Sequence, residues 1–307
     1  MRKLILSMIV MYAVPVYAQD DGSDALLRSL TDAAPPLAME RVEIELAPPL
    51  QIDQISGITT DESGNLYIFQ RGAAADPIIV TDPSGRVQHS FGSGLFNRPH
   101  SIRIDAAGNV WTVDSNTSMV YKFSPSGETL LEIDVGDVPD PAAESCAAAD
   151  IAVGANGLVY VADGYCNARV VVYDSGGRKV REWGRAGTGP GELNLPHGIA
   201  VSPEGEVYVA DRENGRVQWF TTEGEYLGEW RYGGRVLSVA FSPDGELFIS
   251  AEPKGAVPQQ EATVLRIDRT DGSVVGKIDD FGHEIDVGAD GSLLPASLTD
   301  RVVVYRP

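Results

Sequence analysis

Three of the four histidines in this chain occupy one position of an internal repeat. The residues at this position in six aligned segments are, in order, Ser56, His100, Ala149, His197, Leu237 and His283. The histidines therefore fall in the second, fourth and sixth segments. Three imidazole nitrogens that converge on one point and leave a coordination position open are the ligand set of a catalytic zinc ion. The alternative interpretation is that these repeats merely tolerate histidine at the start of a strand.

A second set of polar residues recurs at one distance from the turn glycine of each segment. Arg71 and Arg212 lie seven residues after that glycine in the first and fourth segments, and Tyr165 lies eight residues after it in the third. A single arginine in a loop is ordinarily a solvated surface charge. Two guanidinium groups beside a metal site would instead suit a carboxylate, because their planar fork matches both carboxylate oxygens.

The elements that must position these residues are short strands. The six segments begin near Ile55, Pro99, Ala148, Pro196, Val236 and Gly282, which lie 40 to 49 residues apart. Each reads as an apolar strand, a glycine turn and further alternating strands, and this length is typical of one four-stranded propeller blade. The sequence therefore predicts an all-β, six-bladed propeller with almost no helix. A pair of packed β-sheets is the alternative fold.

The last segment reaches Pro307 after only three strands. We expect Val42 to Leu46 to supply its missing outer strand and so to close the ring. The propeller domain would then comprise residues 41–307.

Composition and the N-terminus limit the function classes. The chain has 44 acidic against 24 basic residues and a net charge of −20, which argues against nucleic-acid binding and against adhesion to anionic membranes. Residues 1–18 combine Arg2 and Lys3, an apolar stretch and a small-residue cleavage site after Ala18, and so predict a secretory signal peptide. The alternative is a transmembrane anchor. We expect an exported protein, periplasmic or secreted, with a polar linker over residues 19–40.

The only two cysteines map to the same end of the same segment. Cys146 precedes the first strand of the third segment, and Cys166 follows Tyr165 in the loop after the second strand. In an exported protein a bridge between them is the natural interpretation, with two free thiols as the alternative.

The loop sequences resemble those of a known family. Asp163 to Arg169 (DGYCNAR), Leu195 to His197 (LPH) and Ala210 to Arg216 (ADRENGR) are similar to peptidyl-α-hydroxyglycine α-amidating lyases, also called peptidylamidoglycolate lyases. That family is a six-bladed propeller of the NHL-repeat type. The resemblance implies zinc on His100, His197 and His283, a catalytic role for Tyr165, Arg71 and Arg212, and a Cys146–Cys166 disulfide.

The resemblance also implies a calcium ion and leaves two differences. The family holds calcium through backbone carbonyls that fall on Ile58 and Ile102 and through an aspartate whose place Glu284 takes here, so calcium binding is in question. A second family disulfide is absent, because its positions are Tyr208 and Trp219 in this chain.

The expected function is that of an exported, monomeric, zinc-dependent lyase. Its substrate would be a small molecule or peptide that ends in α-hydroxyglycine, and its products an amide and glyoxylate. Two alternatives remain at this stage: a non-catalytic propeller that binds a protein or glycan, and a zinc hydrolase or lactonase on the same scaffold.

Overall fold

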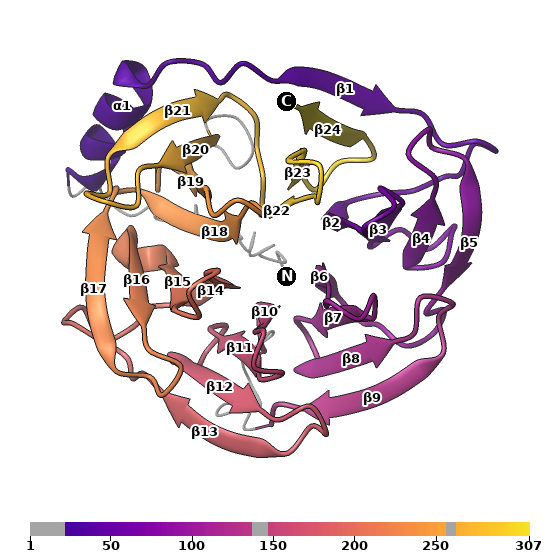
Figure 1. Ribbon diagram of the computed structural model, residues 1–307, viewed down its shortest axis with the longest axis horizontal. Coiled ribbons are helices and arrows are strands. Elements are labelled where there is room, and N and C mark those ends of the chain that lie inside the picture. Colours follow the sequence, from indigo (N-terminus) through magenta and orange to yellow (C-terminus); the bar gives the residue numbers. More distant parts are fainter. Residues whose placement is uncertain (1–21, 137–146, 256–261) are drawn as a thin grey trace, which may run out of the picture.

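The computed structural model describes residues 22–136, 147–255 and 262–307, and within them the chain forms six four-stranded antiparallel sheets arranged as a ring (Figure 1). The predicted six-bladed propeller is thus confirmed. The predicted signal peptide, residues 1–18, lies outside the described residues. No helix in the described part of the chain is long and apolar enough to cross a membrane.

Each of the first five blades is built from four consecutive strands, numbered from the channel outward. The strands are β2 (Ile55–Thr60), β3 (Leu66–Gln70), β4 (Ile78–Thr81) and β5 (Val87–Phe91); β6 (Pro99–Ile104), β7 (Val110–Asp114), β8 (Met119–Phe123) and β9 (Thr129–Asp134); β10 (Asp150–Val153), β11 (Val159–Asp163), β12 (Arg169–Tyr173) and β13 (Lys179–Trp183); β14 (Pro196–Val201), β15 (Val207–Asp211), β16 (Arg216–Phe220) and β17 (Tyr226–Arg231); and β18 (Arg235–Phe241), β19 (Leu247–Glu252), β20 (Thr263–Ile267) and β21 (Val274–Ile278). A short 3₁₀-helix, η1 (Arg212–Asn214), follows β15.

The sixth blade joins the two ends of the described chain. Its strands β22 (Glu284–Val287), β23 (Leu293–Ala296) and β24 (Val302–Arg306) are completed by β1 (Glu40–Ile44), which pairs antiparallel with β24 at the outer edge (Figure 1). The predicted closing strand is therefore confirmed, although it begins and ends two residues earlier than the expected Val42 to Leu46, and its pairing covers the edge of β24.

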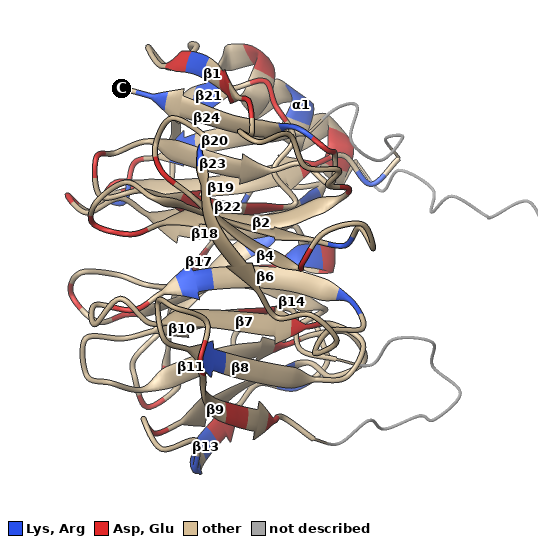
Figure 2. Cartoon of the chain, turned by 90° about the vertical axis from the view of Figure 1, so that its right-hand side faces the viewer, with Lys and Arg blue, Asp and Glu red and all other residues tan. Residues whose placement is uncertain are grey.

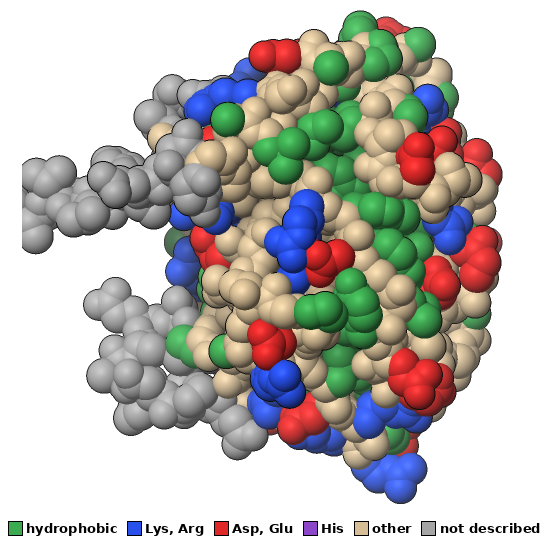
Figure 3. All heavy atoms as spheres, turned by 90° about the vertical axis from the view of Figure 1, so that its left-hand side faces the viewer, with side chains coloured by type: hydrophobic (Ala, Val, Ile, Leu, Met, Phe, Trp, Pro, Cys, Tyr) green, Lys and Arg blue, Asp and Glu red, His purple; other side chains and the backbone are tan. Residues whose placement is uncertain are grey.

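The core lies between the blades, and the alternation of each strand explains how. Along β11, Val159 and Val161 pack against the second blade beside Trp111, whereas Tyr160 and Ala162 pack against the fourth blade beside Ile199. Because successive side chains of a strand point to opposite faces, a strand between two neighbouring blades is buried on both of its faces. Outer strands such as β1, β13 and β17 instead carry charged side chains into solvent, and acidic, basic and apolar groups are intermixed over this surface (Figures 2 and 3).

The segment expected to be a polar linker contains a packed helix, α1 (Ser23–Ala33). Leu27 is buried against Tyr232 and Val236 of the fifth-blade core, and the carboxylate of Asp24 accepts hydrogen bonds from the backbone N–H groups of Lys254 at 2.7 Å and Gly255 at 2.9 Å. The described part of residues 19–40 is therefore an integral part of the propeller rather than a loosely packed linker.

Candidate active site

The histidine position of the repeat is a β-bulge in the inner strand. The pairing of β6 with β7 shifts between Pro99 and Ser101, and that of β14 with β15 shifts between Pro196 and Gly198, so His100 and His197 are the extra residues. A bulge redirects one side chain without ending the strand. His283 stands one residue before β22, where its N–H donates to the carbonyl of Ala296 at 2.8 Å. Local backbone geometry thus aims all three imidazoles into the channel.

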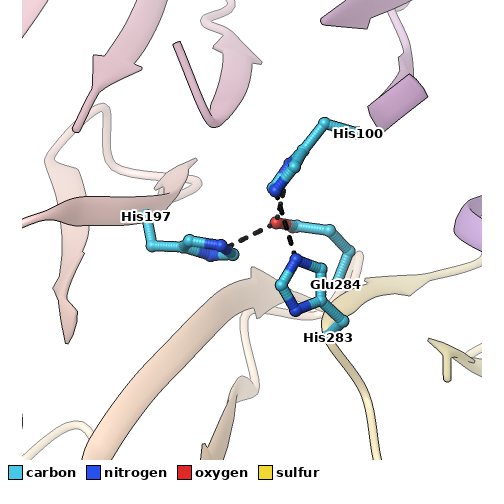
Figure 4. A group of neighbouring side chains, drawn as sticks. All are labelled: His100, His197, His283 and Glu284. Atoms are coloured by element: carbon cyan, nitrogen blue, oxygen red, sulfur yellow. Dashed lines mark hydrogen bonds and ion pairs between the residues drawn. The ribbon is translucent and has the colours of Figure 1, made fainter. Parts of the chain in front are cut away.

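The three imidazoles meet near the axis of the ring (Figure 4). Their ring centroids are 5.0 Å apart for His100 and His197, 5.0 Å for His100 and His283, and 4.8 Å for His197 and His283. The Nε2 atoms of His100 and His283 are 3.1 Å apart. The three residues that the repeat register selected are brought together from blades two, four and six.

Burial keeps these imidazoles neutral. It lowers the pKa of His197 to about 3 and, with the neighbouring imidazoles and Arg71, lowers the pKa values of His100 and His283 well below the usual range. His197 Nδ1 lies 2.7 Å from the carbonyl oxygen of Leu237. Since a carbonyl only accepts, Nδ1 carries the proton and Nε2 keeps its lone pair, which is the usual arrangement of a metal-binding histidine.

These residues fit a zinc ion. Zinc–nitrogen bonds of about 2.0–2.1 Å in a tetrahedral site place two ligand nitrogens about 3.4 Å apart, close to the separation of the His100 and His283 Nε2 atoms. One ligand atom from each of the three histidines and from Glu284 also lies within 4.8 Å of the others. Three neutral nitrogens with a further position nearby match the donor set of a catalytic zinc site.

The hydroxyl of Tyr165 lies beside the three imidazoles. Its hydroxyl lies 2.9 Å from Nε2 of His100 and 2.9 Å from Nε2 of His197. Two backbone hydrogen bonds with Ala147 fix its loop, and Gly164 packs so closely on the carbonyl of Pro196 that any side chain there would clash. The loop after β11 therefore rests directly on the strand that carries His197.

The charge around Tyr165 is positive, but burial dominates its ionisation. Burial raises the pKa of the phenol and the Glu284 carboxylate adds to the rise, while the guanidinium groups of Arg212, Arg98 and Arg71 lower it without reversing the shift. The arginines alone therefore do not favour the phenolate over the phenol.

Two of these arginines are the predicted pair, and the third is one that sequence reasoning missed. Arg71 donates from Nε to the carbonyl of Pro99 at 2.8 Å, and burial lowers its pKa to about 10, with the charge of Arg98 adding to the effect. Arg212 begins η1, with Nε 3.4 Å from Glu213 Oε1. Arg98 lies two residues before His100, and this proximity was the available signal for its place at the site.

Comparison with known proteins supports a common origin with one enzyme family. The NHL repeat model matches residues 146–173 and 193–220. Peptidyl-alpha-hydroxyglycine alpha-amidating lyase 1 of Drosophila melanogaster is 32% identical over 66% of this chain and 41% of its own length, and a probable lyase of the same name from Caenorhabditis elegans is 26% identical over 84% of both chains. The chain is a homologue of the peptidyl-α-hydroxyglycine α-amidating lyases.

Other relatives are much longer, and solved structures show the fold. Peptidylglycine alpha-amidating monooxygenase of Rattus norvegicus is 31% identical over 65% of this chain, which spans about a quarter (24%) of that protein. A streptogramin B lyase structure superposes with a TM-score of 0.61 at 17% identity, covering 87% of this chain and 97% of its own. The structure of a protein described as a putative gluconolactonase gives 0.62 at 13% identity, covering 89% and 93%. At such identities these structures support the propeller fold alone.

The calcium ion implied by the lyase resemblance does not fit this channel. The carbonyl of Ile102 already accepts a hydrogen bond from Nη1 of Arg103 at 3.0 Å, and Oε2 of Glu284 lies 3.1 Å from Nη2 of the same guanidinium. A positive charge therefore occupies the groups that would bind calcium. Ile58, the other carbonyl position, lies on β2 with its side chain buried in the core between blades.

The other lyase feature concerns the cysteines. Cys166, which follows Tyr165, is exposed, and Cys146 falls outside the described residues. The Cys146–Cys166 disulfide stays a prediction.

Proposed function

We propose that this protein is a zinc-dependent lyase that cleaves an N-acyl- or peptidyl-α-hydroxyglycine into an amide and glyoxylate. The observation that carries the proposal is the convergence of three imidazoles with the Tyr165 hydroxyl, which lies 2.9 Å from Nε2 of His100 and of His197, while Nε2 of His283 lies 3.1 Å from that of His100. A scaffold that only binds a partner has no need of this combination. The naming of several homologues as lyases of this kind supports the same reaction class.

The arginines would bind the substrate carboxylate. Arg71 and Arg212 influence the ionisation of Tyr165 and of the histidines, so their charges act at the same place as the proposed metal. A guanidinium can hold both carboxylate oxygens, which fixes the position of the adjacent carbinol carbon. This local cluster would attract an anionic substrate despite the overall charge of −20.

The reaction would move one proton and break one bond. Zinc on His100, His197 and His283 would supply a Lewis acid that acidifies the substrate hydroxyl. Tyr165 would take the hydroxyl proton in its phenolate form, which the arginines and the metal together would favour. The O–H electron pair becomes the second bond of the aldehyde carbonyl, the carbon–nitrogen bond breaks, and the amide nitrogen leaves with its electron pair and takes that proton back from Tyr165. Water, oxidant and reductant are all unnecessary.

The deciding assay is glyoxylate release from α-hydroxyhippuric acid, a small carbinolamide that carries the required carboxylate. Zinc-loaded protein should release glyoxylate and benzamide in equal amounts, well above the spontaneous rate. No release would remove the lyase and leave a binding propeller or a zinc hydrolase. Hydrolysis of the acyl bond instead, giving benzoate, would support the hydrolase.

Tyr165→Phe tests the proton acceptor. It should keep zinc and fold but lower kcat by about 10²–10⁴-fold, the usual scale for a lost general base. Tyr226→Phe is the matched control, because Tyr226 is an exposed residue of the outer strand β17. An unchanged rate in Tyr165→Phe would keep the lyase but exclude this role for Tyr165.

A further inference from the structure

Below the histidines, the channel is crossed by a guanidinium group that the proposed reaction does not use. Arg103 lies on β6, three residues beyond His100, with only 13% of its side chain exposed. Its Nη2 lies 2.7 Å from Asp150 Oδ2 on β10 and 3.1 Å from Glu284 Oε2 on β22. One side chain from the second blade thus pairs with carboxylates from the third and the sixth.

The same two carboxylates also accept hydrogen bonds from the fourth and fifth blades. Asp150 Oδ2 also accepts from the backbone N–H of Ile199 in the fourth blade at 3.1 Å. Glu284 Oε2 accepts from the hydroxyl of Ser238 in the fifth blade at 3.1 Å. The network centred on Arg103 therefore connects blades two to six across the channel.

The charge of Arg103 is firmly held. Burial alone would lower its pKa, but the carboxylates of Asp150, Glu284 and Asp286 raise it above the ordinary value. A calcium ion here would need six to eight oxygen ligands at about 2.3–2.6 Å. The guanidinium already uses the Ile102 carbonyl and both carboxylates, and its charge would repel a second cation.

We propose that Arg103 is the resident cation of this channel, taking the structural place of the calcium ion implied for the lyases, so that the ring closes without calcium. The proposal concerns closure of the ring and is independent of the proposed reaction.

The first test needs no variant. Protein stripped of metal and reloaded with one equivalent of zinc is titrated with calcium chloride, while bound calcium is measured by equilibrium dialysis and Tm by scanning calorimetry. We expect no stoichiometric calcium binding and no calcium-dependent change in Tm. Binding of one calcium per chain, or a rise in Tm at low millimolar calcium, would overturn the proposal.

The second test removes the cation. Arg103→Met keeps much of the side-chain volume but leaves Asp150 and Glu284 buried without their partner, so Tm should fall by on the order of 10 °C. Calcium should then restore part of the loss, because the carboxylates and the Ile102 carbonyl become available. Arg178→Met is the control, since Arg178 is 82% exposed and pairs only at the surface with Asp174.

Two further variants keep the test decisive if Arg103→Met does not fold. Arg103→Lys retains the charge but loses the planar fork, and should show a smaller fall in Tm with no calcium response. Combining Arg103→Met with Glu284→Gln removes both charges of the Arg103–Glu284 ion pair. This double variant should be more stable than Arg103→Met alone. A wild-type Tm in Arg103→Met or Arg103→Lys would show that the guanidinium contributes nothing to closure.

Discussion

The zinc site gives the sharpest test of the proposed function, and His283→Ala is the most informative change. His283 comes from the blade with the least regular repeat sequence, and it is the only one of the three histidines that is partly exposed. Its truncation therefore leaves a smaller buried cavity than truncation of His100 or His197. His89→Ala is the matched control, because that imidazole is exposed and contacts the carbonyl of Pro125 at 3.0 Å.

The expected loss can be worked from the ligand set. Zinc sites with four protein ligands bind with about 10–16 kcal/mol, or about 2.5–4 kcal/mol per ligand. Removing one of three imidazoles should therefore raise the Kd for zinc by about 10²–10³-fold. Competition against a chromophoric chelator measures this directly, and near-ultraviolet circular dichroism checks the fold.

The comparison of variants decides the outcome. Wild type and His89→Ala should each retain one zinc per chain after dialysis, whereas His283→Ala should lose it. A zinc affinity in His283→Ala equal to that of wild type would refute the three-histidine site. Wild-type protein that binds no zinc would refute it as well.

Three other predictions follow from the structure and the sequence. Leu27→Ala should lower the free energy of unfolding by about 2–5 kcal/mol, whereas Leu26→Ala, at a position 43% exposed, should change it by about 0.5 kcal/mol or less in urea unfolding; equal effects would show that α1 does not pack. Thiol titration of unfolded, unreduced protein should find Cys146 and Cys166 both oxidised, and reduction should cost about 3 kcal/mol for a loop of ~20 residues; two titratable thiols would exclude the bridge. Arg212→Lys should raise KM for the carbinolamide, since the ammonium lacks the fork, and an unchanged KM would separate Arg212 from the carboxylate.

The sequence predicted the ring and its histidines because repetition supplies spatial information. A residue that recurs at one position of a repeat must recur at one height in the channel, so alternate blades bring His100, His197 and His283 together. The bulge at that position was not predicted. It depends on the pairing of each inner strand with its neighbour, which residue types alone do not reveal.

The helix and the channel arginine escaped prediction for the opposite reason. Helix α1 is not part of the repeat, so no other segment points to it. Its buried residue Leu27 packs against the distant fifth blade, and this contact is not visible in the local sequence pattern. Arg103 lies in a strand beside ordinary alternating residues, and a single arginine there reads as a surface charge. Its partners Asp150 and Glu284 are 47 and 181 residues away in the chain, so only the closed ring shows the ion pairs.

The charges along the channel give a direction to the proposed reaction. Arg71, Arg98 and Arg212 gather beside Tyr165, whereas Asp150 and Glu284 lie on the far side of the imidazoles with one guanidinium between them. An anionic carboxylate is attracted to the three arginines, whereas Asp150 and Glu284 are already paired with Arg103 and offer it no cationic partner. We infer that the substrate enters with its carboxylate held at the arginine side and its hydroxyl directed toward Tyr165.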